Sequence, residues 1–480
     1  MPAPPFASLL RRLRADKGIA AARSGDADSS GAAARSGDAD SPGAAARPSG
    51  ATARTSGDGI RWPSGITPRA AWRIRFAAVL AVLGPGLVSG FADNDAGGIT
   101  TYSLAGAQYG YDLLWVLLAS QIVLFFTQEV GARLGLATGQ GLTGLARERF
   151  GVRWAAFVTL TMLVANLGST IAEFAGTAAA LGLFGVPTLV SVVVSGAVVM
   201  LLLTRGSFSR VQYLFVAVGF AVSLAYLVSA VLAHPDWGIA GRALVFPQGS
   251  FNAAYWVAVV GTVGTTITPW GQAFIQSYVA DKRLGPEDLT SERLDVGLGA
   301  LLTNLIAGFI VVACAATLWT TGHTQIADAA DAARALEPLA GEATMVLFAV
   351  GLLAASFLGL GVVPLTSAYS ACEAFGWENG VDRRFREAPA FYSLLGFFVV
   401  FAALFVLALP ASSLIQVMFL AQVLNALLLP FVLVFVMLMS RDRRIMGDLA
   451  SGRVLQSIGW AGTTLLIGLS GVLVWTSLGP

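Results

Sequence analysis

Residues 84–101 read GPGLVSGFADNDAGGITT, and they place two carboxylates, an amide and a pair of glycines inside a hydrophobic run. A charged side chain at bilayer depth costs at least ~2.5–3.5 kcal/mol, so Asp93 and Asp95 need a partner, and a cation suits them best. The glycines that follow are poor helix formers, and an unwound backbone there frees carbonyl oxygens as further ligands. The stretch therefore predicts a cation site at a broken transmembrane helix. The alternative is that these polar residues form a loop between two helices.

The composition indicates a membrane protein with many spans. Hydrophobic residues make up 56% of the chain and charged residues only 12%, with a mean hydropathy of +0.72, whereas about 25% of the residues of soluble domains are charged. The net charge of +2 says little about partners, and we expect no nucleic acid and no obligate protein partner.

The sequence offers little for an enzyme or a resident cofactor. Cys314 and Cys372 lie in apolar segments, and His234 and His323 fall in predicted loops. No zinc motif, nucleophile–histidine pair within the bilayer or phosphate-binding glycine loop can be assembled from them. We therefore expect neither catalysis nor a cofactor.

Hydrophobic runs of about 20 residues recur from residue 74 onward, which is the length that spans a bilayer as a helix. They predict eleven spans, at 74–108 (interrupted at 93–98), 112–134, 152–183, 186–204, 211–233, 252–280 (interrupted near 268–271), 295–321, 343–374, 389–408, 412–440 and 456–478. The fold class expected is therefore an all-α integral membrane protein.

The first 70 residues are predicted to be a disordered cytoplasmic tail. They contain an imperfect duplication, RSGDADS, at 23–29 and 35–41 and almost no large apolar residues, so they cannot form a core. The transmembrane domain is expected to occupy residues 71–480.

The positions of Lys and Arg predict the orientation, because cytoplasmic loops carry an excess of both. Alternate loops hold basic residues at Arg133, Arg147, Arg149, Arg153, Arg205, Arg210, Lys282, Arg283, Arg293, Arg383, Arg384, Arg386, Arg441, Arg443, Arg444 and Arg453. The intervening loops hold only Arg242 and Arg334. This pattern predicts a cytoplasmic N-terminus and an extracytoplasmic C-terminus in a multi-pass cell membrane protein, with a bacterial inner membrane as the expected location.

A second interruption is predicted in the sixth span, where residues 261–277 read GTVGTTITPWGQAFIQS. Pro269 has no backbone donor and clashes with the preceding turn, so the carbonyl of Thr265 loses its helical partner. Broken helices at corresponding positions of two halves are a sequence sign of a transport site. The plan implied is two inverted repeats of five spans, at about 74–233 and 252–440, with an extra helix at 456–478.

Several motifs resemble the natural-resistance-associated macrophage protein (Nramp) family of divalent-metal transporters. In chain order they are Gly84-Pro-Gly86, Asp95-x-Gly97, Leu114-Trp115, Ala132-Arg-Leu-Gly135, Thr138-Gly139, Glu173, the Pro269 break, Leu429-Pro-Phe431 and Asp442-Arg-Arg-x-Met-Gly447. The resemblance runs from about residue 74 to the end. It implies a LeuT-type 5+5 inverted repeat plus one helix, with the first and sixth helices unwound at the midplane.

The resemblance also implies a ligand set, from which this sequence departs. Asp95 keeps the family's Asp and Thr265 offers the carbonyl, whereas Gly98 replaces an Asn and Thr268 replaces a Met. Hard oxygen ligands favour Mg²⁺, Ca²⁺ and Mn²⁺, and loss of two side-chain ligands suits Mg²⁺, which dehydrates reluctantly. Oxygen atoms that contact the ion directly or through water could also come from Asp93, Asn94 and Gln272.

The family's proton machinery is depleted at the matching positions. Trp270 replaces a His, and Thr170 replaces an Asp three residues before Glu173. This pattern resembles the Nramp-related magnesium transporter branch, which works without proton coupling. Glu173 is either a functional carboxyl or a buried one paired with a polar neighbour such as Asn166.

Two amides in the tenth span are further candidates for the pathway. Gln422 matches a family Gln that closes on the ion, and Asn425 lies three residues later, on the same helix face. Core hydrogen bonding is the alternative for both. Glu129, beside Arg133 in the second span, is expected to form a structural ion pair rather than a ligand.

The function predicted is import of a divalent cation, Mg²⁺ or Mn²⁺, by alternating access without proton coupling, with Asp95 as the principal ligand. One alternative is a proton-coupled Mn²⁺/Fe²⁺ importer. Another is a sodium-coupled symporter for an organic solute on the same fold. Asp93 and Asp95 disfavour this symporter, because they would repel a substrate carboxylate.

Overall fold

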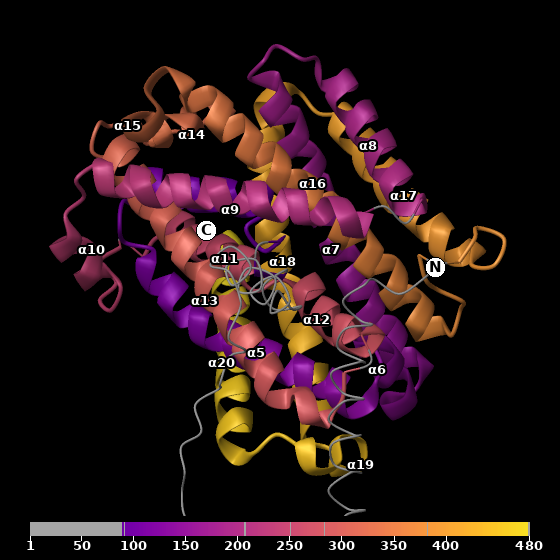
Figure 1. Ribbon diagram of the computed structural model, residues 1–480. Coiled ribbons are helices and arrows are strands. Elements are labelled where there is room, and N and C mark those ends of the chain that lie inside the picture. The colour runs from indigo at the N-terminus through magenta and orange to yellow at the C-terminus, as the bar shows by residue number, and fades with distance from the viewer. Residues whose placement is uncertain are drawn as a thin grey trace, which may run out of the picture. The chain divides into compact units, whose positions relative to one another are not determined.

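The computed structural model describes residues 89–478, except 91, 206, 207, 250, 283 and 382. Within these residues the chain forms helices and no strands (Figure 1). The predicted tail and the first half of the first predicted span lie outside the described residues. The remaining spans can be compared with the structure one by one.

Each remaining predicted span contains at least one helix. The helices are α4 (Ala96–Tyr109), α5 (Leu114–Thr138), α7 (Val152–Gly182), α8 (Thr188–Thr204), α9 (Phe208–Leu232), α11 (Ala253–Thr266), α12 (Pro269–Asp281), α13 (Leu289–Cys314), α16 (Thr344–Phe375), α17 (Pro389–Leu407), α18 (Leu414–Arg441) and α20 (Arg453–Leu478). Glycines in a left-handed conformation end two of them, at Gly139 after α5 and Gly376 after α16.

When the described helices are judged by length and apolarity alone, fewer of them qualify as membrane crossings than the eleven predicted from the sequence. In the described part of the chain, seven helices are long and apolar enough to cross a membrane, or eight if α9 and α10 (Trp237–Ala243), bent by 120°, form one span. The helices α4, α11 and α12, which border the breaks, contain only 13 or 14 residues, and α8 is a shorter apolar helix of 17 residues. The number of crossings and the bounds of the two repeats stay predictions.

The described helices pack around α4 and α7. Helix α7 lies against α16 and α18 (Figure 1). Helix α4 lies among α13, α18, α11 and α7. Gly176 of α7 is needed for this packing, because a side chain there would overlap Ala96 at the start of α4 and Ser356 of α16. The start of α4 is therefore held deep in the bundle.

Short helices connect the long ones at both ends. Figure 1 shows α6 (Leu142–Phe150) and α19 (Arg443–Met446) at the lower end of the bundle, and α14 (Ala329–Ala333) and α15 (Glu337–Ala340) at the upper end. The one-turn helices η2 (Pro286–Asp288), η4 (Arg334–Leu336), η5 (Gly341–Ala343), η6 (Ala411–Ser413) and η7 (Gly447–Leu449) and the π-turn η3 (Ala315–Trp319) complete the described elements. The two interruptions lie between these ends.

Candidate metal site

The first break covers Asp93, Asn94 and Asp95, and α4 begins immediately after it. Asp95 is the N-cap of α4, and its Oδ1 accepts a hydrogen bond of 2.6 Å from the Gly98 amide. A carboxylate satisfies the unpaired amides at a helix start well, which is why the helix resumes here. The prediction of an interruption over 93–98 was therefore too long. Gly97 and Gly98 belong to the first turn of α4.

The second break lies at Ile267 and Thr268, between α11 and α12. Pro269 occupies the first position of α12, where its missing donor costs nothing, and the Thr268 hydroxyl accepts the Gly271 amide at 3.2 Å. The predicted break near 268–271 was thus placed slightly late, because Gly271 is helical. Pro269 lies four positions after Thr265 and has no N–H to donate to the Thr265 carbonyl.

The two breaks meet in space. The Thr268 hydroxyl donates a hydrogen bond of 3.1 Å to Oδ1 of Asp93. A methyl group on Gly98 would lie 3.0 Å from the Asp93 carbonyl oxygen, 3.1 Å from Oγ1 of Thr265 and 3.3 Å from Oδ1 of Asp95. Oxygen atoms from the first break and from the last turn of α11 therefore converge beside Gly98, at a point where only glycine fits without displacing them.

This convergence is buried and includes two acidic residues. Asp93, Asp95 and Thr268 are each 1% exposed and Thr265 is fully buried. Among the described residues no Lys or Arg forms an ion pair with either aspartate, and Oδ2 of Asp93 has no hydrogen-bond partner. Buried carboxylates without a basic partner call for another positive charge.

Among the described residues, no group of three or more Asp, Glu, His or Cys side chains is arranged to hold a metal ion. An ion beside Gly98 would therefore rely on hydroxyl, carbonyl or water oxygens in addition to the Asp95 carboxylate. The structure provides such atoms at both breaks, and the nearby amides could add to them.

Asn94 and Gln272 are the two amides that the sequence added to the candidate site, and their side chains have different surroundings. The Asn94 amide nitrogen donates to the carbonyls of Gly90 (3.3 Å) and Thr303 (3.4 Å), which fixes the side chain against α13 and leaves its oxygen unpaired. Both polar atoms of the Gln272 side chain are buried without a partner. Each residue thus has a free amide oxygen at membrane depth.

Glu173 reaches the first break from α7. One of its carboxyl oxygens accepts the Ala96 amide at 3.4 Å and the other has no hydrogen-bond partner. The Glu173 carboxyl group therefore lies at the start of α4, immediately after Asp95. Asn166, the polar neighbour suggested for Glu173, donates to Ser367 at 2.9 Å, and the choice between the two roles of Glu173 stays a prediction. Thr170 bonds to a carbonyl of its own helix.

The two amides of α18 form a pair that faces α4. Asn425 donates to Oε1 of Gln422 and to Oγ of Ser169, each at 2.9 Å. The Gln422 amide nitrogen has no partner, and a side chain on Gly97 would overlap it. Asn425 therefore fits the core hydrogen-bonding alternative, whereas Gln422 directs an unpaired amide at the start of α4.

Trp270 lies one residue inside α12 and is fully buried. Its ring packs edge to face on Phe274, with the centroids 6.1 Å apart, and its indole nitrogen has no hydrogen-bond partner. The side chain thus places apolar surface at the start of α12. The indole N–H can donate a hydrogen bond, but the ring has no atom that accepts a proton.

Comparison with known proteins identifies the family. The family model described as natural resistance-associated macrophage protein-like (Nramp) matches residues 86–476. The chain belongs to the Nramp family. The match covers all of the candidate metal site, and family membership means that the protein is a membrane transporter of divalent metal cations and not an enzyme.

Similar proteins agree with this membership. The divalent metal cation transporter MntH of Deinococcus radiodurans is 32% identical over 418 residues, which cover 84% of this chain and 91% of that protein. MntH of Burkholderia ambifaria is 28% identical over 420 residues, covering 84% and 91%. The resemblance drawn from the motifs is thus confirmed at the level of the family.

Solved structures confirm the fold class. A manganese transporter of Eremococcus coleocola has a TM-score of 0.67 at 21% identity, covering 87% of this chain and 89% of that one. The amino-acid-bound structure of MhsT has a TM-score of 0.56 at 16% identity, covering 82% and 98%. This Nramp family member therefore has the LeuT-type fold that was predicted, whatever the number of its crossings.

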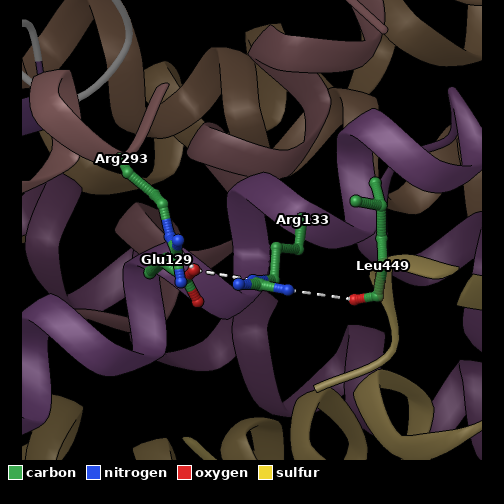
Figure 2. Close-up of polar contacts among 4 residues, drawn as sticks. All are labelled: Glu129, Arg133, Arg293 and Leu449. Atoms are coloured by element: carbon green, nitrogen blue, oxygen red, sulfur yellow. Dashed lines mark hydrogen bonds and ion pairs between the residues drawn. The ribbon is translucent and has the colours of Figure 1, made fainter. Parts of the chain in front are cut away.

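A second charged group of this Nramp protein lies away from the breaks. Oε1 of Glu129 in α5 accepts from Arg133 at 2.6 Å and from Arg293 of α13 at 2.7 Å, and Arg133 also donates to the Leu449 carbonyl at 3.3 Å (Figure 2). The Glu129 side chain is 3% exposed. The expected ion pair is present, and it has a second arginine that the sequence did not reveal.

Three residues near the breaks of this Nramp protein were missed by sequence reasoning. Thr303 of α13 donates to the Gly90 carbonyl at 2.8 Å, Gln128 donates to Ser89 at 3.5 Å, and Met418 accepts from Thr100 of α4 through its sulfur at 3.5 Å. No local motif marks them, because each meets its partner only after folding. Met418 shows that a thioether lies near α4, although it is not at the position of the family's ligand.

Proposed function

We propose that this transporter imports the hard divalent cations Mg²⁺ and Mn²⁺ by alternating access, without proton coupling. The observation that carries the proposal is the convergence of oxygen atoms from Asp93, Asp95 and Thr265 beside Gly98. In the proposed site Asp95 is the principal ligand. Asp93, Asn94, the Thr265 carbonyl, Thr268 and Gln272 complete a hydrated shell.

The donor atoms favour hard ions. Position 268 carries a hydroxyl that is bonded to Asp93, where the family resemblance implies a thioether. Oxygen ligands and retained water suit Mg²⁺, while a thioether favours softer transition metals. The names of the relatives specify divalent metals or manganese, which is consistent with Mn²⁺ as a second substrate.

The absence of proton coupling is inferred from two substitutions. Trp270 stands where the resemblance implies a His, and Thr170 bonds to its own helix where it implies an Asp. Neither side chain titrates near neutral pH. Gln422 is proposed to close on the ion from α18, because its side chain lies against Gly97 in the first turn of α4; binding would use its amide oxygen, which accepts from Asn425 in this structure.

A second candidate function is favoured by one contact. Glu173 accepts the amide of Ala96, the residue after Asp95, so its carboxyl group is placed to release a proton when an ion binds at Asp95. A protein that released this proton to the same side as the metal would be a proton-coupled Mn²⁺/Fe²⁺ importer. A sodium-coupled symporter for an organic solute is less suitable, because the two aspartates would repel a substrate carboxylate.

The test is uptake into proteoliposomes that contain the purified protein, with one dye for Mg²⁺ or Mn²⁺ and another for internal pH. We expect both ions to enter without a pH change in the wild type, and no uptake with Asp95→Ala. Robust flux through Asp95→Ala would overturn the site. Mn²⁺ entry with acidification and without Mg²⁺ entry would establish the proton-coupled alternative.

A further inference from the structure

A large cavity lies at the end of the bundle that carries α6. Its volume is about 1060 Å³, and it is lined by α12, α16, α6 and the connection that precedes α6. The basic loops of this end are those that the charge pattern places in the cytoplasm. The cavity therefore lies on the side on which an imported ion would leave.

Glu373 of α16 is the acidic residue set deepest in the wall of this cavity. Oε1 accepts from the Ser277 hydroxyl of α12 at 3.5 Å, and Oε2 accepts from the Thr143 hydroxyl of α6 at 3.3 Å. Gly141 lies so close that any side chain there would overlap the carboxyl group. Two helices thus each place a hydroxyl group beside this carboxylate, and the Thr143 hydroxyl also donates to the Ser370 carbonyl at 2.6 Å.

No described cation neutralises Glu373. Two basic residues line the same cavity, but Lys282 lies over the Tyr278 ring at 4.4 Å and the Arg147 guanidinium lies against Gly376. Neither forms an ion pair with Glu373. The lining also contains Glu148 and Asp281, so carboxylates outnumber basic side chains by three to two.

A face of α16 connects the candidate metal site to this cavity. Gly359 packs directly against the Glu173 carboxyl, and Val362, Thr366 and Glu373 line the cavity further along the same helix face. At a rise of about 1.5 Å per residue, Gly359 and Glu373 are about 21 Å apart. On α12 a row of rings in edge-to-face and tilted contact runs from Trp270, beside the second break, to Phe274 and Tyr278, which line the cavity.

We propose that Glu373, with the hydroxyls of Ser277 and Thr143, forms a second cation site, which holds a hydrated divalent ion between the candidate metal site and the cytoplasm. A carboxylate sunk in a protein wall without a basic partner attracts a counter-charge. One carboxylate and two hydroxyls bind weakly and leave the ion most of its water, which favours release. The identity of the ion rests on the proposed function, whereas the site itself is inferred from the contacts of Glu373.

The experiment measures carboxyl labelling by dicyclohexylcarbodiimide in the wild-type protein in nanodiscs, with the modification of Glu373 quantified by peptide mass spectrometry. We expect millimolar Mg²⁺ or Mn²⁺ to slow labelling of Glu373 severalfold, and choline at the same ionic strength to have no effect. Unchanged labelling with either divalent ion would overturn the proposal.

Two variants separate this site from the candidate metal site. In Asp95→Ala the divalent ions should still protect Glu373, and loss of protection would overturn the proposal by showing that occupancy of the first site alters the cavity. Ser277→Ala should raise the half-protecting concentration several times, whereas the matched change Ser223→Ala, in α9, should not. Equal values for the two serine variants would also contradict the site.

Discussion

Gly98→Ala tests the geometry of the candidate metal site most directly. The added methyl would lie 3.0–3.3 Å from three oxygen atoms, Asp93 O, Thr265 Oγ1 and Asp95 Oδ1. Ordinary contacts between carbon and oxygen begin near 3.4 Å, so the oxygens must recede by about 0.1–0.4 Å. Overpacking of this kind costs about 1–3 kcal/mol.

The ions should respond differently to this expansion. Mg²⁺ demands oxygen ligands at about 2.0–2.1 Å in near-ideal geometry, while Ca²⁺ accepts them at about 2.3–2.6 Å. We expect Gly98→Ala to reduce Mg²⁺ flux about tenfold or more, which corresponds to about 1.4 kcal/mol or more. Ca²⁺ flux should fall less, so the ratio of Ca²⁺ to Mg²⁺ transport should rise.

The assay is initial-rate uptake of Mg²⁺, Mn²⁺ and Ca²⁺ into proteoliposomes at matched protein density. Gly308→Ala in α13 is the matched control, because nothing lies within 4 Å of the added methyl there. Unchanged Mg²⁺ flux in Gly98→Ala would mean that Gly98 does not border the ion. Equal loss for all three ions would mean that the methyl blocks movement of the helices rather than reshaping a binding site.

Further predictions concern selectivity, stability and packing. Thr268→Met should shift the preference toward Mn²⁺, Fe²⁺ or Cd²⁺, measured by competition in the uptake assay; unchanged selectivity would show that this position does not touch the ion. Glu129→Gln leaves two arginines unpaired and should lower stability by about 3–5 kcal/mol, whereas Arg293→Gln removes the half-exposed partner and should cost about 1 kcal/mol or less. Thermal unfolding in detergent checks this order, and equal losses would contradict it. Gly264→Ala should greatly reduce the yield of folded protein, because the methyl would meet backbone atoms of α18; normal yield and size-exclusion behaviour would refute this.

The breaks could be predicted from sequence because their causes are local. An aspartate before a new helix and a proline that removes a donor are each readable within a few residues. The glycines were harder to interpret. Gly97 and Gly98 permit close approach of Gln422 and of the site oxygens, and the sequence cannot distinguish this need from a need to unwind.

The contacts that assemble the site could not be predicted, because they join distant parts of the chain. Thr268 meets Asp93 across 175 positions, and Asn94 meets Thr303 across 209. Hydrophobic periodicity gives the helices and their approximate ends but not which faces meet. The second arginine at Glu129 and the thioether of Met418 were missed for the same reason.

The two short breaks also define where this protein can bend. Helices α4 and α12 each begin at a single capping side chain, Asp95 or Thr268. The ion pair between Glu129 and Arg293, in contrast, joins α5 to α13. Rotation about a few backbone bonds at each break is therefore the least costly motion. The oxygens that converge beside Gly98 belong to the first break and to the end of α11, just before the second break. A bound ion would therefore restrict rotation at both breaks. Ion binding and helix movement would then occur at the same place, so no chain of side-chain contacts is needed to couple them.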